Sequence, residues 1–311
     1  MTKVKKIIAE QKTLVFLLLL VILMGIISPF FLTGDNIVNV LVQSSIYGIM
    51  ACGMTFAIIG GDFDLSVGST MALSGLVAIL CAPYVGQVPA MLLALLASVA
   101  VGLVNGFLVA KCGISSFIVT IGTSYIFKGI ALKISSGDPI ASSNPWFGRL
   151  GNDKILGIPY LVIIMVLLVL ITHYVLTATR FGRNIYTIGG NMEVAHNSGI
   201  RTAFYKTSIF VLSAFTAGTA GILNASKLNT ASAVQGDNAA LSVITGVVIG
   251  GTSLIGGVGS IGKSMIGILI FSVITNALDL MGVFSYYQTG IRGLMLIVII
   301  GMEAYARYRE S

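Results

Sequence analysis

The sequence predicts an all-α integral membrane protein with about ten transmembrane helices. Of its 311 residues, 56% are hydrophobic and only 9% are charged, and the mean hydropathy is +0.98. Soluble domains, by comparison, have about a quarter of their residues charged. A helix needs roughly 20 apolar residues to cross the hydrocarbon core, and long runs here contain no Lys, Arg, Asp or Glu. These runs are residues 13–34, 36–61, 65–110, 155–179, 207–226 and 238–262.

The expected spans follow from these runs, from the positions of Gly and Pro and from charge, within a single transmembrane domain covering residues 1–311. The longest run is divided at Pro83, Gly86 and Pro89. The first apolar stretch follows a basic start but lacks a small-residue cleavage site, so we expect it to remain as a span rather than to be removed as a secretory signal. The expected spans are 13–32, 37–60, 66–84, 89–110, 114–134, 158–178, 205–226, 238–256, 264–282 and 288–305.

The distribution of basic residues predicts that both termini lie in the cytoplasm. Twelve of the eighteen Lys and Arg residues fall on one side when the N-terminus is placed inside, which satisfies the positive-inside rule and requires an even number of spans. The sequence pI of about 9.3 therefore reflects charges at helix ends, and no nucleic-acid partner is expected. The inside set is Lys3, Lys5, Lys6, Lys12, Lys111, Arg180, Arg183, Arg201, Lys206, Lys263, Arg307 and Arg309.

Two loops are long enough to hold structure. The external loop, 134–157, contains the only tryptophan, Trp146, which suits an interfacial anchor or a docking surface. Glycine clusters at 59–69 and 249–260 indicate breaks between helices, and their shared Ile-Gly-Gly and Val-Gly-Ser sequences hint at an internal repeat of the kind found in transporters.

Residues 257–264 match G-x-x-x-x-G-K-[ST], the phosphate-binding loop of many nucleotide hydrolases. That loop works in an α/β domain, after a buried strand and with a carboxylate that reaches magnesium. Here the flanks are expected membrane spans, so nucleotide hydrolysis is rejected. Two histidines, His173 and His196, and scattered acids assemble neither a metal site nor a nucleophile–base pair, so no enzyme activity is expected.

Polar residues near the spans offer three candidate features. Asp62 and Asp64 follow the second span, where capping of the next helix is favoured and a place beside a transport path is the second choice. Asp279 and Arg292 bracket a short external connection and are expected to pair and steady a hairpin. Ser, Thr and Asn recur within the spans, where they could bind a neutral hydroxylated solute or hydrogen-bond between helices. The cysteines show no metal-ligand spacing and are expected to be buried free thiols; they are Cys52, Cys81 and Cys112.

The cytoplasmic loop, 179–206, is too polar to cross the membrane. Asn191 is expected to cap a short helix that carries Glu193 in its first turn, with Ser198 and Gly199 at its end. Such a helix could lie in a groove of a partner, or it could be a simple surface helix.

This loop resembles the coupling segment of the ribose/xylose-type, binding-protein-dependent sugar ABC transporter permeases. Residues 179–200, TRFGRNIYTIGGNMEVAHNSGI, are similar to the pattern T-R-x-G-R-x-I-Y-A-x-G-G-N-x-x-A-A-x-x-S-G-I. The resemblance extends from about Gln11 to Glu303 and includes the motifs at 60–69, 105–123, 248–259 and 285–288. The chain departs from the pattern at Val194 and at His196-Asn197, which suggests a dedicated partner ATPase, and at Ser115-Ser116, where prolines are usual.

The resemblance implies the permease subunit of an ATP-binding-cassette importer that moves a pentose-like or hexose-like sugar across the bacterial inner membrane. It implies no cofactor on this chain, since ATP and magnesium would be bound by a cytoplasmic ATPase. The other implied partners are membrane lipid, a second permease subunit, identical or related, and a periplasmic or lipid-anchored sugar-binding protein. The alternatives are an ion-coupled secondary transporter, whose mid-span carboxylates this sequence lacks, and an intramembrane enzyme.

The resemblance also assigns roles to residues. Those expected to couple to the ATPase are Gly189, Gly190, Asn191, Glu193, Ala195, Ser198 and Gly199. Those expected along the translocation path are Asp64, Ser66, Asn105, Phe117, Thr120, Thr123, Asn224 and Gln235.

Overall fold

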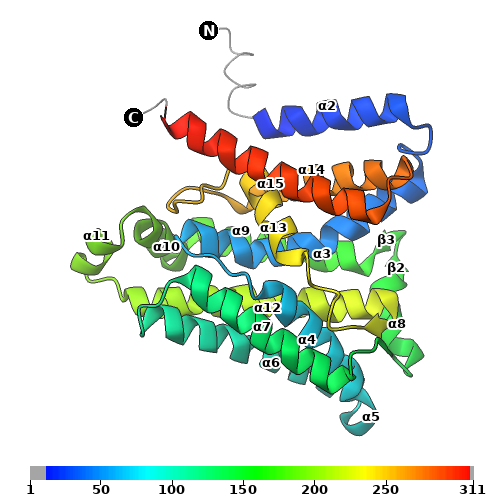
Figure 1. Cartoon of the computed structure of the whole chain (residues 1–311), viewed down its shortest axis with the longest axis horizontal. Helices are drawn as coiled ribbons and strands as arrows, with labels where there is room; N and C mark the ends of the chain where they lie inside the picture. Colours follow the sequence, from blue (N-terminus) through cyan, green and yellow to red (C-terminus); the bar gives the residue numbers. More distant parts are fainter. Residues whose placement is uncertain (1–11, 309–311) are drawn as a thin grey trace.

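A computed structural model describes residues 12–308 as an array of helices that run roughly parallel or antiparallel to one another (Figure 1). The basic residues Lys3, Lys5, Lys6 and Arg309, used above for orientation, lie outside the described residues. The helices are α2 (Lys12–Ile27), α3 (Gly34–Ile59), α4 (Val67–Leu80), α5 (Ala82–Val85), α6 (Gln87–Ala110), α7 (Ser116–Ser135), α8 (Pro145–Asn152), α9 (Tyr160–Ala178), α10 (Arg180–Gly190), α11 (Met192–Asn197), α12 (Thr202–Leu228), α13 (Ala239–Ile249), α14 (Ile261–Leu280) and α15 (Ser285–Tyr308). The strands are β1 (Ile140–Ala141), β2 (Lys154–Ile155), β3 (Ile158–Pro159) and β4 (Thr230–Ala231).

Each expected span contains a helix, but the helices differ in length. Within the described residues, six are long and apolar enough to cross a membrane by length and composition: α3, α6, α7, α9, α12 and α14. Helices α2, α4 and α13 are apolar but have only 16, 14 and 11 residues. The expected span at 238–256 is wrong as a continuous helix beyond Ile249, because α13 ends at Ile249 with Gly250 as its C-cap. The next residue, Gly251, takes a φ of +89°, which favours glycine and breaks the helix.

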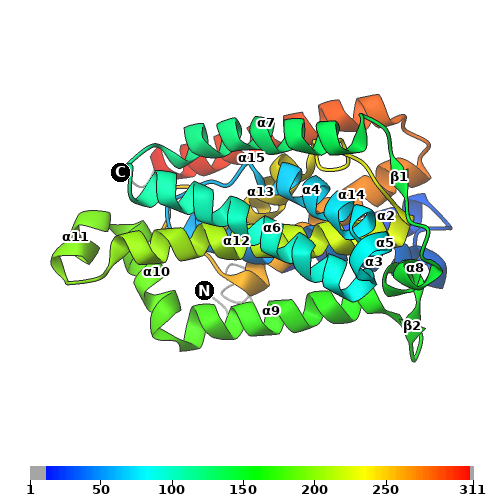
Figure 2. The ribbon, with the colours of Figure 1, turned by 90° about the horizontal axis from the view of Figure 1, so that it is seen from below.

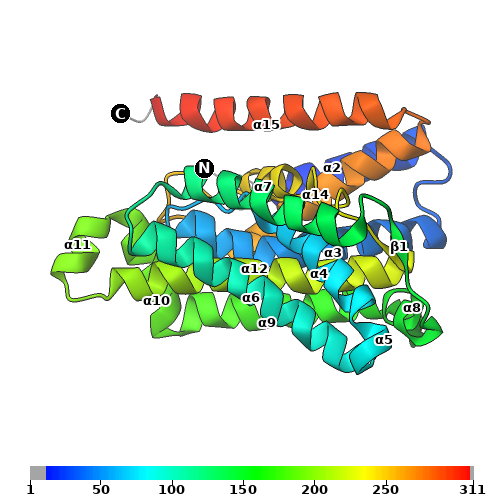
Figure 3. The ribbon, with the colours of Figure 1, turned by 60° about the horizontal axis from the view of Figure 1, so that its bottom comes forward.

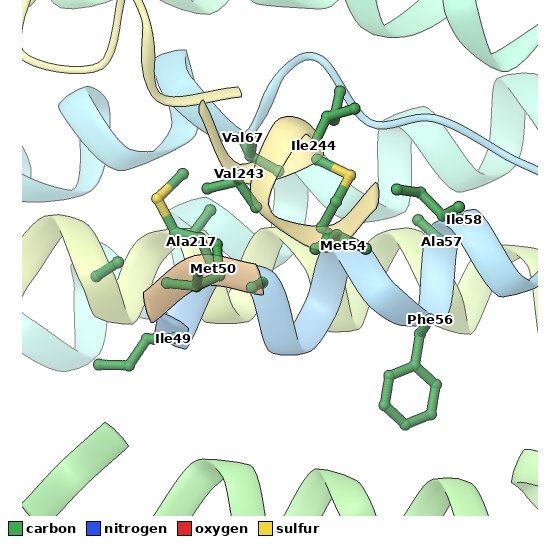
Figure 4. Packing of buried hydrophobic residues seen from close by; sticks show 14 of the residues in the cluster. Ile49, Met50, Met54, Phe56, Ala57, Ile58, Val67, Ala217, Val243 and Ile244 are labelled. Atoms are coloured by element: carbon green, nitrogen blue, oxygen red, sulfur yellow. The ribbon is translucent and has the colours of Figure 1, made fainter. Parts of the chain in front are cut away.

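Helix α12 lies at the centre of the molecule and packs against α3, α4 and α6. Small residues allow this close approach: a Cβ atom on Gly102 of α6 would lie 2.6 Å from the carbonyl oxygen of Phe210 of α12. Such contacts are the main source of helix association in lipid, where apolar burial contributes little. On the other side of α3, Met54 packs in one cluster with Val67 of α4 and Val243 of α13 (Figure 4).

The two half-length helices α4 and α13 meet at their N-terminal ends. Each is preceded by a non-helical segment, 60–66 before α4 and 229–238 before α13. The backbones of Gly68 and Gly236 touch there, and a Cβ atom on either glycine would collide with the carbonyl oxygen of the other. The Gly68–Gly236 contact lies inside the helix array, because Met71, one turn further along α4, contacts Gly221, which is seven residues before the end of α12.

The loop 134–157, expected to be external, folds onto the end of α12. Strand β1 pairs antiparallel with β4, the short helix α8 buries Phe147 completely, and the Ser226 hydroxyl of α12 donates a hydrogen bond to the Phe147 carbonyl oxygen. Helix α8 and strands β1 and β2 lie at one end of the array, and α10 and α11 lie at the other (Figure 2). The last described residues of α15 lie on the side of α10 and α11 (Figure 1).

Two smaller expectations need correction. Cys52 is buried as expected, but Cys81 is only partly buried and Cys112 is exposed. Asp279 and Arg292 do not form a direct ion pair; Gln288 bridges them, donating to Asp279 Oδ1 at 2.8 Å and accepting from Arg292 at 3.4 Å. The bridge still joins α14 to α15 across the turn, which was the role expected for a direct pair.

Candidate functional site

The segment between α9 and α12 forms two short helices at one end of the molecule. The Thr179 hydroxyl accepts the backbone N–H of Gly182 and begins α10, which the sequence analysis missed. The sequence does contain a pattern typical of this helix, because Phe181, Ile185 and Ile188 recur at helical spacing. In the structure, Ile185 and Ile188 are buried. Asn191 then ends α10 and begins the next helix.

Helix α11 forms as the sequence predicted. The Asn191 side chain accepts the Val194 N–H at 3.0 Å, Glu193 lies in the first turn, and Gly199, with a φ of +79°, donates to His196 at 2.9 Å and ends the helix. Only Ala195 of α11 is buried, whereas Met192 and Val194 are about half exposed. Helix α11 therefore protrudes at the end of the molecule as a free surface (Figure 3).

The end of α10 packs backbone to backbone against both glycine clusters. We call this contact the glycine junction and define it by Ile59, Gly61, Gly189, Gly256 and Gly257. The Gly257 N–H donates to the Ile59 carbonyl oxygen at 2.8 Å, and a Cβ atom on Gly189 would collide with that oxygen and lie 2.7 Å from Gly257 N. A Cβ atom on Gly256 would lie 2.8 Å from Gly189 O and 3.0 Å from the Cα of Gly61. The two breaks, far apart in sequence, thus converge on the end of α10.

Two side-chain contacts reinforce the junction. The Tyr186 hydroxyl of α10 donates to the Gly259 carbonyl oxygen at 2.8 Å, and burial raises the pKa of this phenol above its ordinary value. Lys206 Nζ of α12 lies 3.0 Å from Asp62 Oδ2 in a pair whose side chains are only 13% and 5% exposed. The expected capping role of Asp62 is therefore wrong: its carboxylate ties the first break to α12.

Asp64 enters a fully buried polar cluster with Ser66, Asn105 and Ser213. Asp64 Oδ1 accepts the Ser66 N–H at 3.0 Å and the Ser66 hydroxyl at 2.6 Å, and the Ser66 hydroxyl accepts the Asn105 amide at 2.8 Å. Asp64 thus caps the turn that leads into α4, two residues before the N-cap residue Ser66, so the favoured role holds in a modified form. Asp64 Oδ2, Asn105 Oδ1 and Ser213 Oγ are buried without a hydrogen-bond partner.

The other expected path residues do not join this cluster. Thr120 and Thr123 of α7 are buried, and the Thr120 hydroxyl donates to Ser116 O at 2.7 Å and reaches Phe63 O at 3.3 Å. Phe117 is 54% exposed on the outer face of α7. Asn224 and Gln235 are half-buried nearer the opposite end, where the Gln235 side chain donates to Thr230 O at 3.2 Å.

The segment that matches a phosphate-binding loop has the wrong surroundings for that role. It lies between the helices α13 and α14, and the preceding element is a helix rather than a strand. The Ser260 hydroxyl accepts the Lys263 N–H at 3.2 Å and begins α14. Among residues 12–308, no group of three or more His, Cys, Asp or Glu side chains could hold a metal ion.

Comparison with known proteins establishes the family. Residues 36–300 match the family described as branched-chain amino acid transport system / permease component. The chain belongs to this permease family. No solved structure matches it.

Curated relatives cover nearly the whole permease. It is 37% identical over 296 residues to the ribose import permease protein RbsC of Escherichia coli (strain K12), covering 94% of this chain and 92% of the relative. It is 36% identical over 294 residues to the D-allose transport system permease protein AlsC of the same strain, covering 94% and 90%. It is 35% identical over 296 residues to the L-arabinose ABC transporter permease protein AraH of Azospirillum brasilense, covering 94% and 87%.

These relatives confirm the resemblance and the class of function inferred from the sequence. The permease belongs among inner-membrane permease subunits of ABC importers, whose ATPase activity resides in a separate subunit. The permease is therefore not an enzyme, and the ion-coupled secondary transporter is the less supported alternative.

Proposed function

We propose that this permease carries a neutral sugar through the membrane and that an ATPase drives it through α10 and α11. The observation that carries the proposal is the glycine junction, where Gly189 at the end of α10 touches both helix breaks. Ribose, D-allose and L-arabinose, the sugars in the names of the relatives, are the first solutes to test.

The orientation we propose has ten crossings with both termini in the cytoplasm. Basic residues gather at the end of the array formed by α10 and α11, where Arg180, Arg183 and Arg201 lie between α9 and α12 and Lys206 lies near the start of α12. The positive-inside rule then makes that end cytoplasmic. Helices α4 and α13, each joined to a non-helical segment, would cross together with it, an arrangement known from transporters with discontinuous helices.

Coupling to ATP hydrolysis would begin at α11. Its exposed apolar side chains Met192 and Val194 and the acidic Glu193 suit a groove on a cytoplasmic ATPase. Because interiors are close-packed and transmit displacement, movement of α11 would pass through α10 to the glycine junction. Segments 60–66 and 250–260 would move with it and shift α4, α13 and the Asp64 cluster.

Substrate delivery would occur at the opposite end. Helix α8 and the β1–β4 pair form a folded surface there, on which a periplasmic or lipid-anchored sugar-binding protein could dock. A second permease subunit would complete the path, and ATP and magnesium would bind only to the ATPase. The low charge of the spans suits an uncharged solute.

Reconstitution tests the proposal. The permease, its ATPase and its binding protein, placed together in proteoliposomes, should accumulate radiolabelled ribose, allose or arabinose only when ATP is inside with the ATPase. Liposomes containing the permease alone provide the control. Uptake by the permease alone down a proton or sodium gradient would overturn the proposal.

A further inference from the structure

Lys128 and Asp237 form an ion pair on the surface of the single chain. Lys128 Nζ of α7 lies 2.6 Å from Asp237 Oδ1 in the segment before α13, and the two side chains are 31% and 42% exposed. Neither residue belongs to the coupling segment or to the Asp64 cluster. The pair joins α7 to the non-helical segment 229–238. The same segment also contacts α4, through Gly236.

The pair lies at membrane depth. Lys128 is the thirteenth residue of the 20-residue helix α7, about 18 Å from its start at 1.5 Å per residue. Helix α7 is long and apolar enough to span a membrane. Asp237 directly follows Gly236, whose backbone touches Gly68 at the inner start of α4. Lys128 is therefore seven residues from the nearer end of α7, and the ion pair holds Asp237, which precedes α13, at the same depth.

Lipid is a poor environment for this pair. Ionisable side chains within spans almost always face the bundle interior or a water-filled cavity, because hydrocarbon cannot replace their hydration. The neighbouring exposed residues of α7, such as Tyr125 and Ile126, are large and apolar. A lysine alone could extend toward the membrane surface, but the shorter Asp237 side chain holds Lys128 at this depth.

The chemistry around the pair suits an uncharged polyol. Asn238 is exposed beside Asp237, and Gln235 is half-buried on the same segment. Ammonium, carboxylate and amide groups together offer both donors and acceptors to sugar hydroxyls, while the paired charges cancel. A wall of this kind would solvate a neutral sugar without attracting ions of one sign.

We propose that the face bearing Lys128, Asp237 and Asn238 lines the solute path near mid-membrane, opposite the second permease subunit already proposed, which is here a second copy of this chain. This inference rests on the proposed transport function. The site is incomplete in one chain, because its polar groups are open on one side.

Single-cysteine accessibility tests the inference without relying on ATP or transport. In full-length protein with Cys52, Cys81 and Cys112 replaced by Ser, Asn238→Cys introduces a thiol next to the pair without breaking it. The matched control is Leu170→Cys, in the middle of α9 on an apolar face where Leu170 is 59% exposed. Both variants are reconstituted in sealed vesicles and treated with a charged, water-soluble methanethiosulfonate.

We expect the Asn238→Cys thiol to react at least about tenfold faster than the Leu170→Cys thiol, because the charged reagent reaches only hydrated surfaces. We also expect a bis-maleimide to cross-link Asn238→Cys into a dimer of the chain. Equal, slow reaction at the two positions would place the face in lipid and overturn the inference. Fast reaction without cross-linking would overturn the second copy as the opposite wall. Labelling of both thiols after denaturation confirms that each is present.

Exchange of the charges gives a second, independent measurement. Asp237→Lys places two ammonium groups together at membrane depth and should reduce ATP-driven sugar uptake by about tenfold or more. The double variant Lys128→Asp/Asp237→Lys restores a pair and should recover most of the uptake. Equal uptake in the single and double variants would overturn the role of the pair. The accessibility result stands even if uptake does not depend on ATP, so the two proposals fail separately.

Discussion

The backbone nitrogen of Gly257 lies 2.8 Å from the carbonyl oxygen of Ile59 and donates a hydrogen bond to it. This bond joins the end of α3 to the non-helical segment after α13, and Gly189 at the end of α10 lies against both partners. Three separate parts of the chain therefore share one backbone contact at the end of the molecule where α11 protrudes. A rigid contact of this kind can transmit a push from α11 to both helix breaks.

Gly189→Ala should damage this contact, whereas Gly190→Ala should not. A methyl group on Gly189 collides with the Ile59 carbonyl oxygen, while one on Gly190 meets no atom within 4 Å. Overpacking typically costs about 1–3 kcal/mol, so Gly189→Ala should lower the midpoint of thermal unfolding in detergent and the sugar transported per ATP. Gly190→Ala is the matched control for stability. Equal unfolding midpoints for the two variants would contradict the contact.

Tyr186→Phe should weaken the link between α10 and the segment before α14. The ring is retained, but the hydrogen bond to Gly259 O is lost, at a cost of about 1 kcal/mol. Because burial raises the pKa of Tyr186 above 10.0, the contribution of the bond is present below that pH and is lost as pH rises through the folded-state pKa. The stability difference between wild type and variant, followed by unfolding across alkaline pH, should shrink only above 10.0. A difference that vanishes at lower pH would argue against the bond.

Breaking the Lys206–Asp62 pair from one side should cost more than removing both charges. Each side chain is largely buried, and an unpaired buried charge costs roughly 3–5 kcal/mol. We expect Lys206→Met to be strongly destabilised and Lys206→Met/Asp62→Asn to recover part of the loss. A double-mutant cycle on unfolding free energies measures the coupling. Additive effects of the two substitutions would mean that the pair does not interact.

Local structure was predictable from sequence wherever neighbouring residues determine it. Asn191 begins α11 and Gly199 ends it, as expected, because capping and a positive φ act within a few residues. Hydropathy located the helices because runs of apolar residues indicate segments with apolar surroundings. It does not report backbone conformation, so the charge-free run 238–262 concealed the end of α13 at Ile249.

The long-range contacts of the candidate site were less predictable because they join residues that are distant in sequence. Asp62 is 144 positions from Lys206 and Lys128 is 109 positions from Asp237, and neither pair has a sequence signal. Gly189 looked like the adjacent Gly190, yet a Cβ atom on Gly189 would collide with the Ile59 carbonyl oxygen, whereas one on Gly190 would meet no atom within 4 Å. Ser213 of the Asp64 cluster was likewise indistinguishable from the other hydroxyl residues in the spans.

Asp64→Asn should be tolerated better than Asp64→Ala. The asparagine oxygen can still accept from Ser66, and its new amide can donate to Asn105 Oδ1 or Ser213 Oγ, which are buried and have no partner. Alanine instead leaves the buried Ser66 N–H and hydroxyl without an acceptor, at a cost of about 1–3 kcal/mol. Unfolding midpoints of the two variants, purified in the same detergent, provide the measurement. Greater loss for Asp64→Asn than for Asp64→Ala would contradict this account of the cluster.

The exposed apolar side chains of α11 should determine affinity for the ATPase without affecting the fold. Met192 and Val194 are 48% and 54% exposed, while Ala195 on the opposite side is fully buried, so polar substitutions at the first two positions leave the packing of α11 intact. We expect Met192→Ser/Val194→Ser to weaken binding of the ATPase by about tenfold or more, since apolar anchors at an interface carry most of its binding energy.

Leu156→Ser is the matched control, because Leu156 is 98% exposed in the loop at the other end of the molecule. Binding is measured by titrating purified ATPase onto the permease in nanodiscs, with thermal unfolding of each variant in parallel. If the α11 variant binds as tightly as the Leu156 variant, the ATPase contacts another surface, and the route through Gly189 loses its starting point.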